Sequence, residues 1–211
     1  MSTNTIGSAR VATTTEYPRR IPILFGIFTA VAVFGWIVST FLSGIHFWGI
    51  PQIPDGATVS GSLEVITSSW AYIGPVPLAT LGAAYYLTTV VLAVWWLDTR
   101  HPIIIKLLTP ITATGVVASA YFVWLQLVPI GEICPFCMVS AGATVVLFGL
   151  ELAILRESTT PPLREILGEL EFALGETNVA VVVVPLLVGL TSVVGMFLIP
   201  LLPLPDPVPF A

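Results

Sequence analysis

Residues 21–43 of this chain read IPILFGIFTAVAVFGWIVSTFLS and contain no charged side chain. A helix needs about 20 mainly apolar residues to cross the hydrocarbon core of a bilayer, and this stretch is long enough. The apolar core of a cleavable signal peptide has only about 7–15 residues, and no small-residue cleavage site follows this stretch. The sequence therefore predicts a transmembrane helix that stays in the mature protein.

The composition of the whole chain agrees with a lipid environment. Of the 211 residues, 56% are hydrophobic and 9% are charged, and the mean hydropathy is +0.99. A soluble domain has about 25% charged residues, and one water-soluble core of this length cannot hide so much apolar surface. The net charge is −5, and no basic patch is present that would contact phosphates. We therefore expect contact with membrane lipid and exclude nucleic acid as a partner.

Other apolar stretches of the chain also reach the length of a membrane span. They are residues 75–97, 103–128, 135–155 and 179–202. Together with the first stretch they predict an all-α membrane protein with five transmembrane helices.

The distribution of Lys and Arg predicts how these helices are oriented. With five spans, every basic residue falls on one side of the membrane: Arg10, Arg19, Arg20, Arg100, Lys106, Arg156 and Arg164. Loops rich in Lys and Arg stay in the cytoplasm. The N-terminus is therefore expected in the cytoplasm and the C-terminus outside, in the inner (plasma) membrane of a prokaryotic cell.

The segments between and beside the spans are short. Residues 1–20 predict a disordered cytoplasmic N-terminus, and residues 204–211 predict an extended, Pro-rich outer tail. The outer loop, residues 44–74, has a second half that reads either as a short helix or as a strand-like cover over the bundle. Residues 156–178 predict an amphipathic cytoplasmic linker that lies against the bundle or docks a cytosolic partner.

Both cysteines lie in the sequence GEICPFCMVS, residues 131–140. Cys134 and Cys137 are one helical turn apart, so their sulfurs lie on one side and can form a disulfide. Pro135 is typical of the first turn of a helix, and a helix N-terminus stabilises a thiolate. The predicted topology places the pair on the outer face, where the compartment is oxidising. These features favour a redox-active pair.

The two cysteines have three other interpretations, namely a metal site, a structural disulfide and an inert dithiol. A metal site would need more nitrogen or sulfur ligands, and His46 is the only histidine on the same side, so no metal is expected. A structural disulfide that closes so short a loop adds little stability. An inert dithiol stays open as an alternative. Glu132 either assists proton transfer or lies at the solvated rim.

A dithiol at the outer end of a membrane bundle lies between two kinds of redox partner. Lipid-soluble molecules approach from the membrane, and among them a quinone is the obvious electron acceptor. Phe136, Trp124 and Trp48 are candidates to line an apolar quinone site, although an aromatic belt at the membrane interface explains them equally well.

Two blocks of the sequence resemble the vitamin K epoxide reductase (VKOR) family of membrane quinone–thiol oxidoreductases. YFVWLQLVPIGEICPFCMVSA, residues 121–141, resembles the family's signature, in which Cys-x-x-Cys begins the fourth helix. SLEVITSSWAYIGPVPLATLGAAYYL, residues 62–87, resembles its outer loop and second helix. The resemblance covers about residues 20–155. It implies a four-helix transmembrane domain at residues 21–155 around a quinone, with residues 179–203 as an additional fifth helix.

The resemblance also implies roles for individual residues. Cys137 would engage the quinone, menaquinone or ubiquinone, and Cys134 would exchange with incoming thiols. Ser68 resembles the family's loop serine or threonine near the active site. The implied electron donor is a periplasmic thioredoxin-fold (DsbA-like) protein. The implied activity is a quinone-linked thiol–disulfide oxidoreductase.

The chain departs from the family's pattern in the outer loop. The family usually has a second cysteine pair there, which relays electrons to the membrane pair, and this chain has Ser62 and about Pro54 at those positions. Bacterial members often continue into a thioredoxin-like domain, which this sequence lacks. Either a partner's dithiol reacts directly with Cys134, or the fold serves as a non-catalytic accessory subunit of a larger respiratory or photosynthetic membrane complex. Replacement of the loop cysteines is a third explanation.

Overall fold

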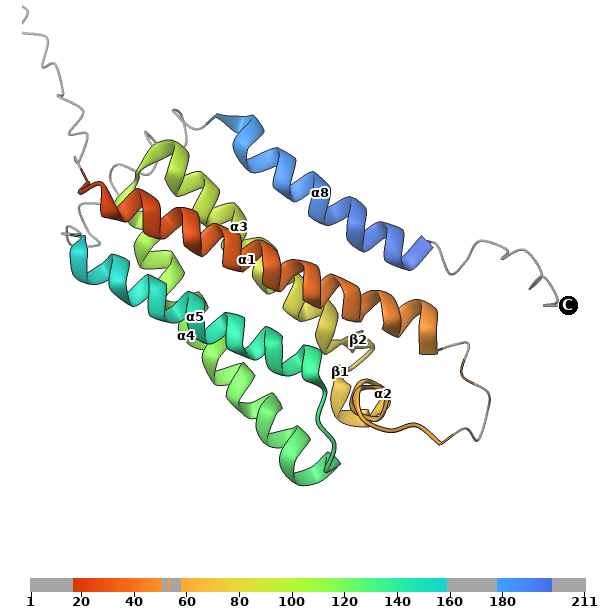
Figure 1. Cartoon of the computed structure of the whole chain (residues 1–211). Helices are drawn as coiled ribbons and strands as arrows, with labels where there is room; N and C mark the ends of the chain where they lie inside the picture. Colours follow the sequence, from red (N-terminus) through yellow and green to blue (C-terminus); the bar gives the residue numbers. More distant parts are fainter. Residues whose placement is uncertain (1–16, 51–52, 54–57, 159–177, 199–211) are drawn as a thin grey trace, which may run out of the picture.

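Four long helices form the body of the protein in a computed structural model that describes residues 17–50, 53, 58–158 and 178–198 (Figure 1). All four are long and apolar enough to cross a membrane. They are α1 (Arg20–Gly44), α3 (Leu78–Thr99), α4 (Pro102–Leu125) and α5 (Pro135–Glu157). The predicted all-α membrane bundle is confirmed, and each helix begins within three residues of its predicted span.

A further helix, α8 (Val179–Leu198), begins where the fifth span is predicted. It lies along α3, and Gly189 allows this approach because a Cβ atom there would overlap the side chain of Leu87. The four long helices are long and apolar enough to cross a membrane, whereas α8 contributes only a shorter apolar helix, Val182–Ser192. Its passage through a membrane therefore stays a prediction, and residues 199–203 of that span lie outside the described residues.

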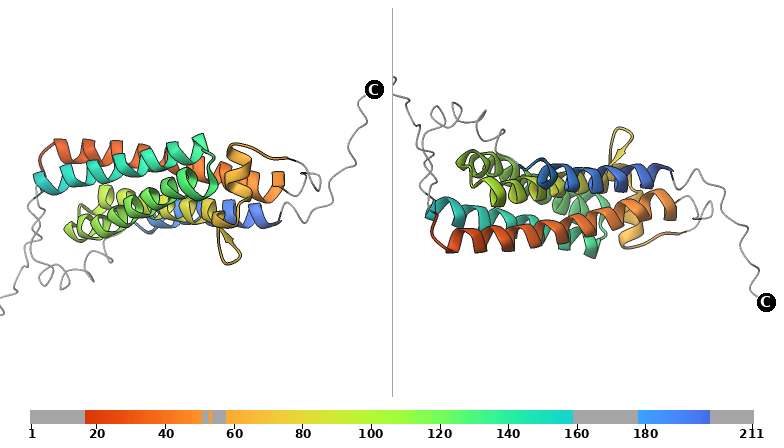
Figure 2. Two further views of the ribbon diagram at one scale, coloured as in Figure 1. Left: turned by 90° about the horizontal axis from the view of Figure 1, so that it is seen from below. Right: turned by 90° about the horizontal axis from the view of Figure 1, so that it is seen from above.

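The helices form two layers, as Figure 2 shows, with α1 beside α5 in one layer and α3, α4 and α8 in the other. Helices that follow one another in the chain run in opposite directions. The described Lys and Arg residues therefore gather at one end of the bundle, where α1 and α4 begin and α3 and α5 end: Arg19, Arg20, Arg100, Lys106 and Arg156. The two cysteines lie at the opposite end.

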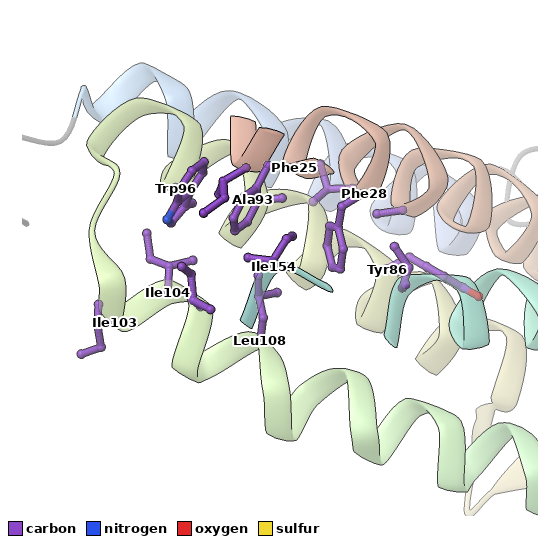
Figure 3. Packing of buried hydrophobic residues seen from close by; sticks show 14 of the residues in the cluster. Phe25, Phe28, Tyr86, Ala93, Trp96, Ile103, Ile104, Leu108 and Ile154 are labelled. Carbon is purple, nitrogen blue, oxygen red and sulfur yellow. The ribbon is translucent and has the colours of Figure 1, made fainter. Parts of the chain in front are cut away.

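The core at the basic end is built on stacked rings (Figure 3). The Phe25 ring lies parallel to the Trp96 ring, with 3.8 Å between their centroids. The Arg100 guanidinium lies 4.7 Å from the centroid of the same indole, a cation–π contact. Nearer the middle of the bundle, Tyr86 is buried against α1, where Gly35 makes room because a Cβ atom would overlap the tyrosine ring.

The segment between α1 and α3 covers the cysteine end of the bundle. A π-helical turn, Ile45–Gly49, extends α1, and α2 (Ser62–Thr67) follows later in the chain. A 3₁₀ turn, Ser69–Ala71, leads into two short antiparallel strands, β1 (Tyr72–Ile73) and β2 (Val76–Pro77), in which Ile73 pairs with Val76. The sequence predicts either a short helix or a strand-like cover here, and the segment contains both: the helix α2 first and the two short strands after it.

The connection from α4 to α5 positions the two cysteines at the start of α5. α4 ends in a π-helical turn, Gln126–Ile130, and Gly131 then takes a left-handed conformation with φ 78°. That conformation suits glycine, and it lets the Gly131 N–H bond back to the Gln126 carbonyl at 3.0 Å. Pro135 occupies the first turn of α5, as predicted, and Cys134 is its N-cap.

Some predicted segments lie mainly outside the described residues. They are most of the N-terminal segment 1–20, nearly all of the linker 156–178 and the tail 204–211. Their predicted disorder, amphipathic character and extended form stay predictions.

Candidate functional site: a cysteine pair beside a membrane cavity

The two cysteines are neighbours at the first turn of α5. Both are free thiols, and their sulfurs lie 2.6 Å apart, with the Cys137 thiol donating to the Cys134 sulfur. The Cys137 backbone N–H also points at the Cys134 sulfur, at 3.3 Å. Cys134 thus caps the helix with its sulfur, in the place where the side-chain oxygen of Ser, Thr, Asp or Asn is usual. Closing a disulfide requires only a small movement of either side chain.

The surroundings of Cys134 favour its thiolate. The hydrogen bond from the Cys137 thiol is the largest cause that lowers the pKa of Cys134, from 9.0 to about 6. Burial opposes this effect, whereas hydrogen bonds from the Cys137 and Phe136 backbone and from the Ser62 hydroxyl strengthen it. At neutral pH the pair therefore consists of a Cys134 thiolate and a Cys137 thiol that donates to it. A thiol with a lowered pKa is also the better leaving group in thiol–disulfide exchange.

Cys134 is fully buried and held in place by its neighbours. Its backbone N–H donates to the Gln126 side-chain oxygen at 2.8 Å, and Gln126 is itself buried. Leu42 of α1 and Val65 of α2 form an apolar cluster with Cys134. The sulfur therefore lies beneath α2, with the Ser62 hydroxyl as its polar neighbour from that helix.

Cys137 differs from Cys134 because it lines a cavity of about 370 Å³ between the helices. Most of the lining side chains are apolar, and they come from α1, α3, α4 and α5, with α2 and the segment up to β1 above them. Cys134 is not among the lining residues. Besides Cys137, the lining includes these polar or aromatic residues: Ser39, His46, Ser68, Trp70, Tyr85, Tyr86, Thr114, Ser119, Phe122, Gln126, Ser140 and Thr144.

A hydrogen-bond network fixes the wall of the cavity below Cys137. The Tyr86 hydroxyl donates to the Ser140 carbonyl at 2.5 Å and lies 2.8 Å from the Thr144 hydroxyl. Ser140 and Thr144 follow Cys137 by three and seven residues on α5, so they lie about one and two turns deeper in the bundle. The network joins α3 to α5 directly beneath the cysteine pair.

The structure divides the predicted site residues into two groups. Ser68 lines the cavity together with Cys137, and its hydroxyl donates to the Val65 carbonyl at 2.8 Å. Phe136, Trp124 and Trp48 do not line it: their side chains are 44%, 52% and 41% exposed.

The exposed aromatic residues have neighbours of their own kind on the outside of the bundle. The Phe136 ring contacts Phe41, and the Trp124 ring stacks on Tyr121. Their positions match the aromatic belt that the sequence offered as an equal explanation.

Sequence reasoning missed Tyr85, which lines the cavity from α3. Its contact with Gly115 on α4, where a Cβ atom would overlap the Tyr85 hydroxyl, exists only once the helices pack, so the sequence carries no signal for it. His46, weighed in the sequence only as a metal ligand, also lines the cavity. Within the part of the chain that the structure describes, no three His, Cys, Asp or Glu side chains lie close enough together to hold a metal ion.

Comparison with known proteins agrees with this architecture. No curated protein matches the chain. A family model, however, matches residues 26–152, more than half of the chain and all four long helices of the bundle. On this match the chain belongs to the Vitamin K epoxide reductase family, whose members are membrane oxidoreductases associated with quinones.

Proposed function

We propose that the chain is a quinone-linked thiol–disulfide oxidoreductase in which Cys134 and Cys137 carry the electrons. One observation supports this most strongly. Two sulfurs 2.6 Å apart lie in different surroundings, since Cys137 faces an apolar cavity and Cys134 lies buried beneath α2. Such a pair connects a ligand in the membrane with a thiol partner outside it.

The cavity fits the head group of a quinone in size and in chemistry. Its volume of about 370 Å³ falls within the range of small-molecule sites, about 300–1,000 Å³, and its lining is mainly apolar with a few polar groups. Menaquinone and ubiquinone share this requirement, because both combine an apolar ring with carbonyl oxygens. A bound quinone supplies the acceptor for the two electrons and two protons that are released when the two thiols become a disulfide.

The proposed electron donor is a periplasmic thioredoxin-fold (DsbA-like) protein with a dithiol of its own. In the exchange, the partner's two thiols become a disulfide while the Cys134–Cys137 disulfide returns to two thiols. Cys134 is fully buried beneath α2, so a protein thiol reaches it only when α2 moves away. The Ser62 hydroxyl, bonded to the Cys134 sulfur, marks the side from which the partner would enter.

The proposed orientation follows from the charges at the bundle ends. The described Lys and Arg residues lie at the end opposite the cysteines, and the positive-inside bias assigns that end to the cytoplasm. We infer a multi-pass protein of the prokaryotic inner (plasma) membrane, with the cysteine pair on the periplasmic side. Labelling of single-cysteine variants in intact cells, one at Glu157 and one at Glu132, tests this: a membrane-impermeant maleimide should modify only the second.

The activity is tested by counting thiols. Reduced protein in lipid nanodiscs should lose two thiols and produce one quinol per chain when excess ubiquinone or menaquinone analogue is added. The Cys137→Ser variant should keep its remaining thiol and produce no quinol. Wild-type protein that keeps both thiols in excess quinone would refute the proposal.

The alternative, a non-catalytic accessory subunit of a respiratory or photosynthetic complex, is favoured by the burial of Cys134 and by Ser62 in place of a relay cysteine. It predicts stable co-purification with a large membrane complex whose activity does not change in Cys137→Ser. The thiol count above separates the two functions, since an idle pair produces no quinol.

A further inference from the structure

Among the described residues that line the cavity, Tyr85 has a buried polar atom without a hydrogen-bond partner. The Tyr85 hydroxyl oxygen is shielded from solvent, and among the described residues it has no hydrogen-bond partner. A hydroxyl that is buried without a partner costs free energy, so proteins rarely leave one in this state. The same residue lines the cavity.

The neighbouring helix leaves space for this hydroxyl. Gly115 of α4 lies against it, and a Cβ atom at that position would overlap the Tyr85 oxygen and its ring. On either side of Gly115 along α4, Thr114 and Ala118 also line the cavity. The pair of Tyr85 and Gly115 therefore forms a close contact at the cavity wall and leaves the hydroxyl hydrogen without an acceptor.

The adjacent tyrosine cannot take over this role. Tyr86 is one residue further along α3, its ring is 5.1 Å from that of Tyr85, and its hydroxyl is already engaged with Ser140 and Thr144. Those two α5 residues lie about one and two turns deeper than Cys137. Tyr85 thus provides a free donor at a depth below the cysteine that faces the cavity.

We propose that the Tyr85 hydroxyl donates a hydrogen bond to a ring carbonyl oxygen of the quinone in this cavity. This inference rests on the proposed function and deepens it, since it names a residue that positions the quinone for Cys137. A carbonyl oxygen is an acceptor without a donor, and it complements a hydroxyl that lacks an acceptor. Ring systems without a carbonyl gain nothing from Tyr85.

The test measures binding and not turnover. Wild-type and Tyr85→Phe proteins, with the cysteine pair oxidised, are titrated with a 2,3-disubstituted 1,4-naphthoquinone and with the matching naphthalene that has no carbonyl. Trp70 lines the cavity, so quenching of tryptophan fluorescence reports the quinone, and competition against it reports the naphthalene. Tyr121→Phe is the matched control, because Tyr121 lies 49% exposed on the outside of α4.

Tyr85→Phe should weaken quinone binding about fivefold, the effect of one lost hydrogen bond, and leave naphthalene binding unchanged. Tyr121→Phe should change neither. Without ligand, Tyr85→Phe should melt at the wild-type temperature or higher, because the substitution deletes a hydroxyl that has no partner among the described residues. A lower melting temperature would indicate a structural role of this hydroxyl and overturn the inference. Equal quinone affinity in wild type and Tyr85→Phe also overturns it and leaves the proposed function standing. Absence of quinone binding in wild-type protein would refute the proposed function as well.

Discussion

The thiolate character of Cys134 depends on the other cysteine, and Cys137→Ala tests this dependence. The substitution removes the S–H group that donates to the Cys134 sulfur across 2.6 Å, and it keeps the backbone N–H that caps the helix. Because the lost hydrogen bond is the largest cause of the lowered pKa, we expect the pKa of Cys134 to rise from about 6 toward 9.0.

The size of the shift follows from the strength of the bond. A hydrogen bond to a charged group contributes about 1.5–3 kcal/mol, and each pKa unit corresponds to about 1.4 kcal/mol. The pKa of Cys134 in Cys137→Ala should therefore lie about one to two units higher, near 7–8. At pH 7 the thiolate fraction then falls from about nine-tenths to between about one-tenth and one-half.

The assay is a pH titration of the ultraviolet absorbance of the thiolate in reduced protein. Cys137→Ser serves as the matched control, because its hydroxyl keeps a donor beside the Cys134 sulfur and should hold the midpoint closer to that of the wild type. A midpoint in Cys137→Ala that stays within about half a unit of the wild-type value would refute the reasoning. In that case the backbone N–H groups at the helix start and the Ser62 hydroxyl would account for the thiolate.

Further predictions concern stability and the neighbours of the site. Folding lowers the pKa of Cys134, so the thiolate stabilises the reduced protein above the unfolded pKa, near 9.0, and this contribution is lost as pH falls through about 6. In thermal melts, the difference in melting temperature between the wild type and Cys134→Ser should therefore increase with pH. Ser62→Cys should form a disulfide with Cys134 on mild oxidation, detected by mass spectrometry of linked peptides and absent when Cys134→Ser is added. Gly35→Ala should destabilise the bundle by about 1–3 kcal/mol in thermal or denaturant unfolding, because its methyl group overlaps the Tyr86 ring, whereas Gly26→Ala, which meets no atom within 4 Å, should not.

The spans and the cysteine turn could be predicted from the sequence because each rests on a strong local signal. A charged residue or proline bounds most of the apolar stretches, so α5 begins at Pro135 as expected and α1 begins one residue early, at Arg20. The position of Cys134 at the helix start follows from Pro135 alone. These features need no knowledge of which helices are neighbours.

The lining of the cavity could not be predicted in the same way. In a membrane helix the face toward lipid and the face toward the bundle are both apolar, so hydrophobic periodicity does not tell them apart. Trp124 and Phe122 illustrate this, since they lie two residues apart on α4 and only Phe122 lines the cavity. Tyr85 and Tyr86 are a second example, although they are adjacent on α3. The Tyr85 hydroxyl has no hydrogen-bond partner among the described residues, whereas the Tyr86 hydroxyl lies within hydrogen-bond distance of three oxygens.

The separate surroundings of the two sulfurs have a consequence for the order of events. A ligand in the cavity meets Cys137 but not Cys134, and a protein thiol meets Cys134 only after α2 moves away from it. The sulfur that exchanges with a protein thiol is therefore shielded while the membrane side of the pair stays open. Because the Ser62 hydroxyl bonds to that sulfur, displacement of α2 also removes one of the interactions that lower the pKa of Cys134. Access and thiolate character at Cys134 are thus opposed: opening the site to a partner raises the pKa of Cys134 and makes it a poorer leaving group in the exchange.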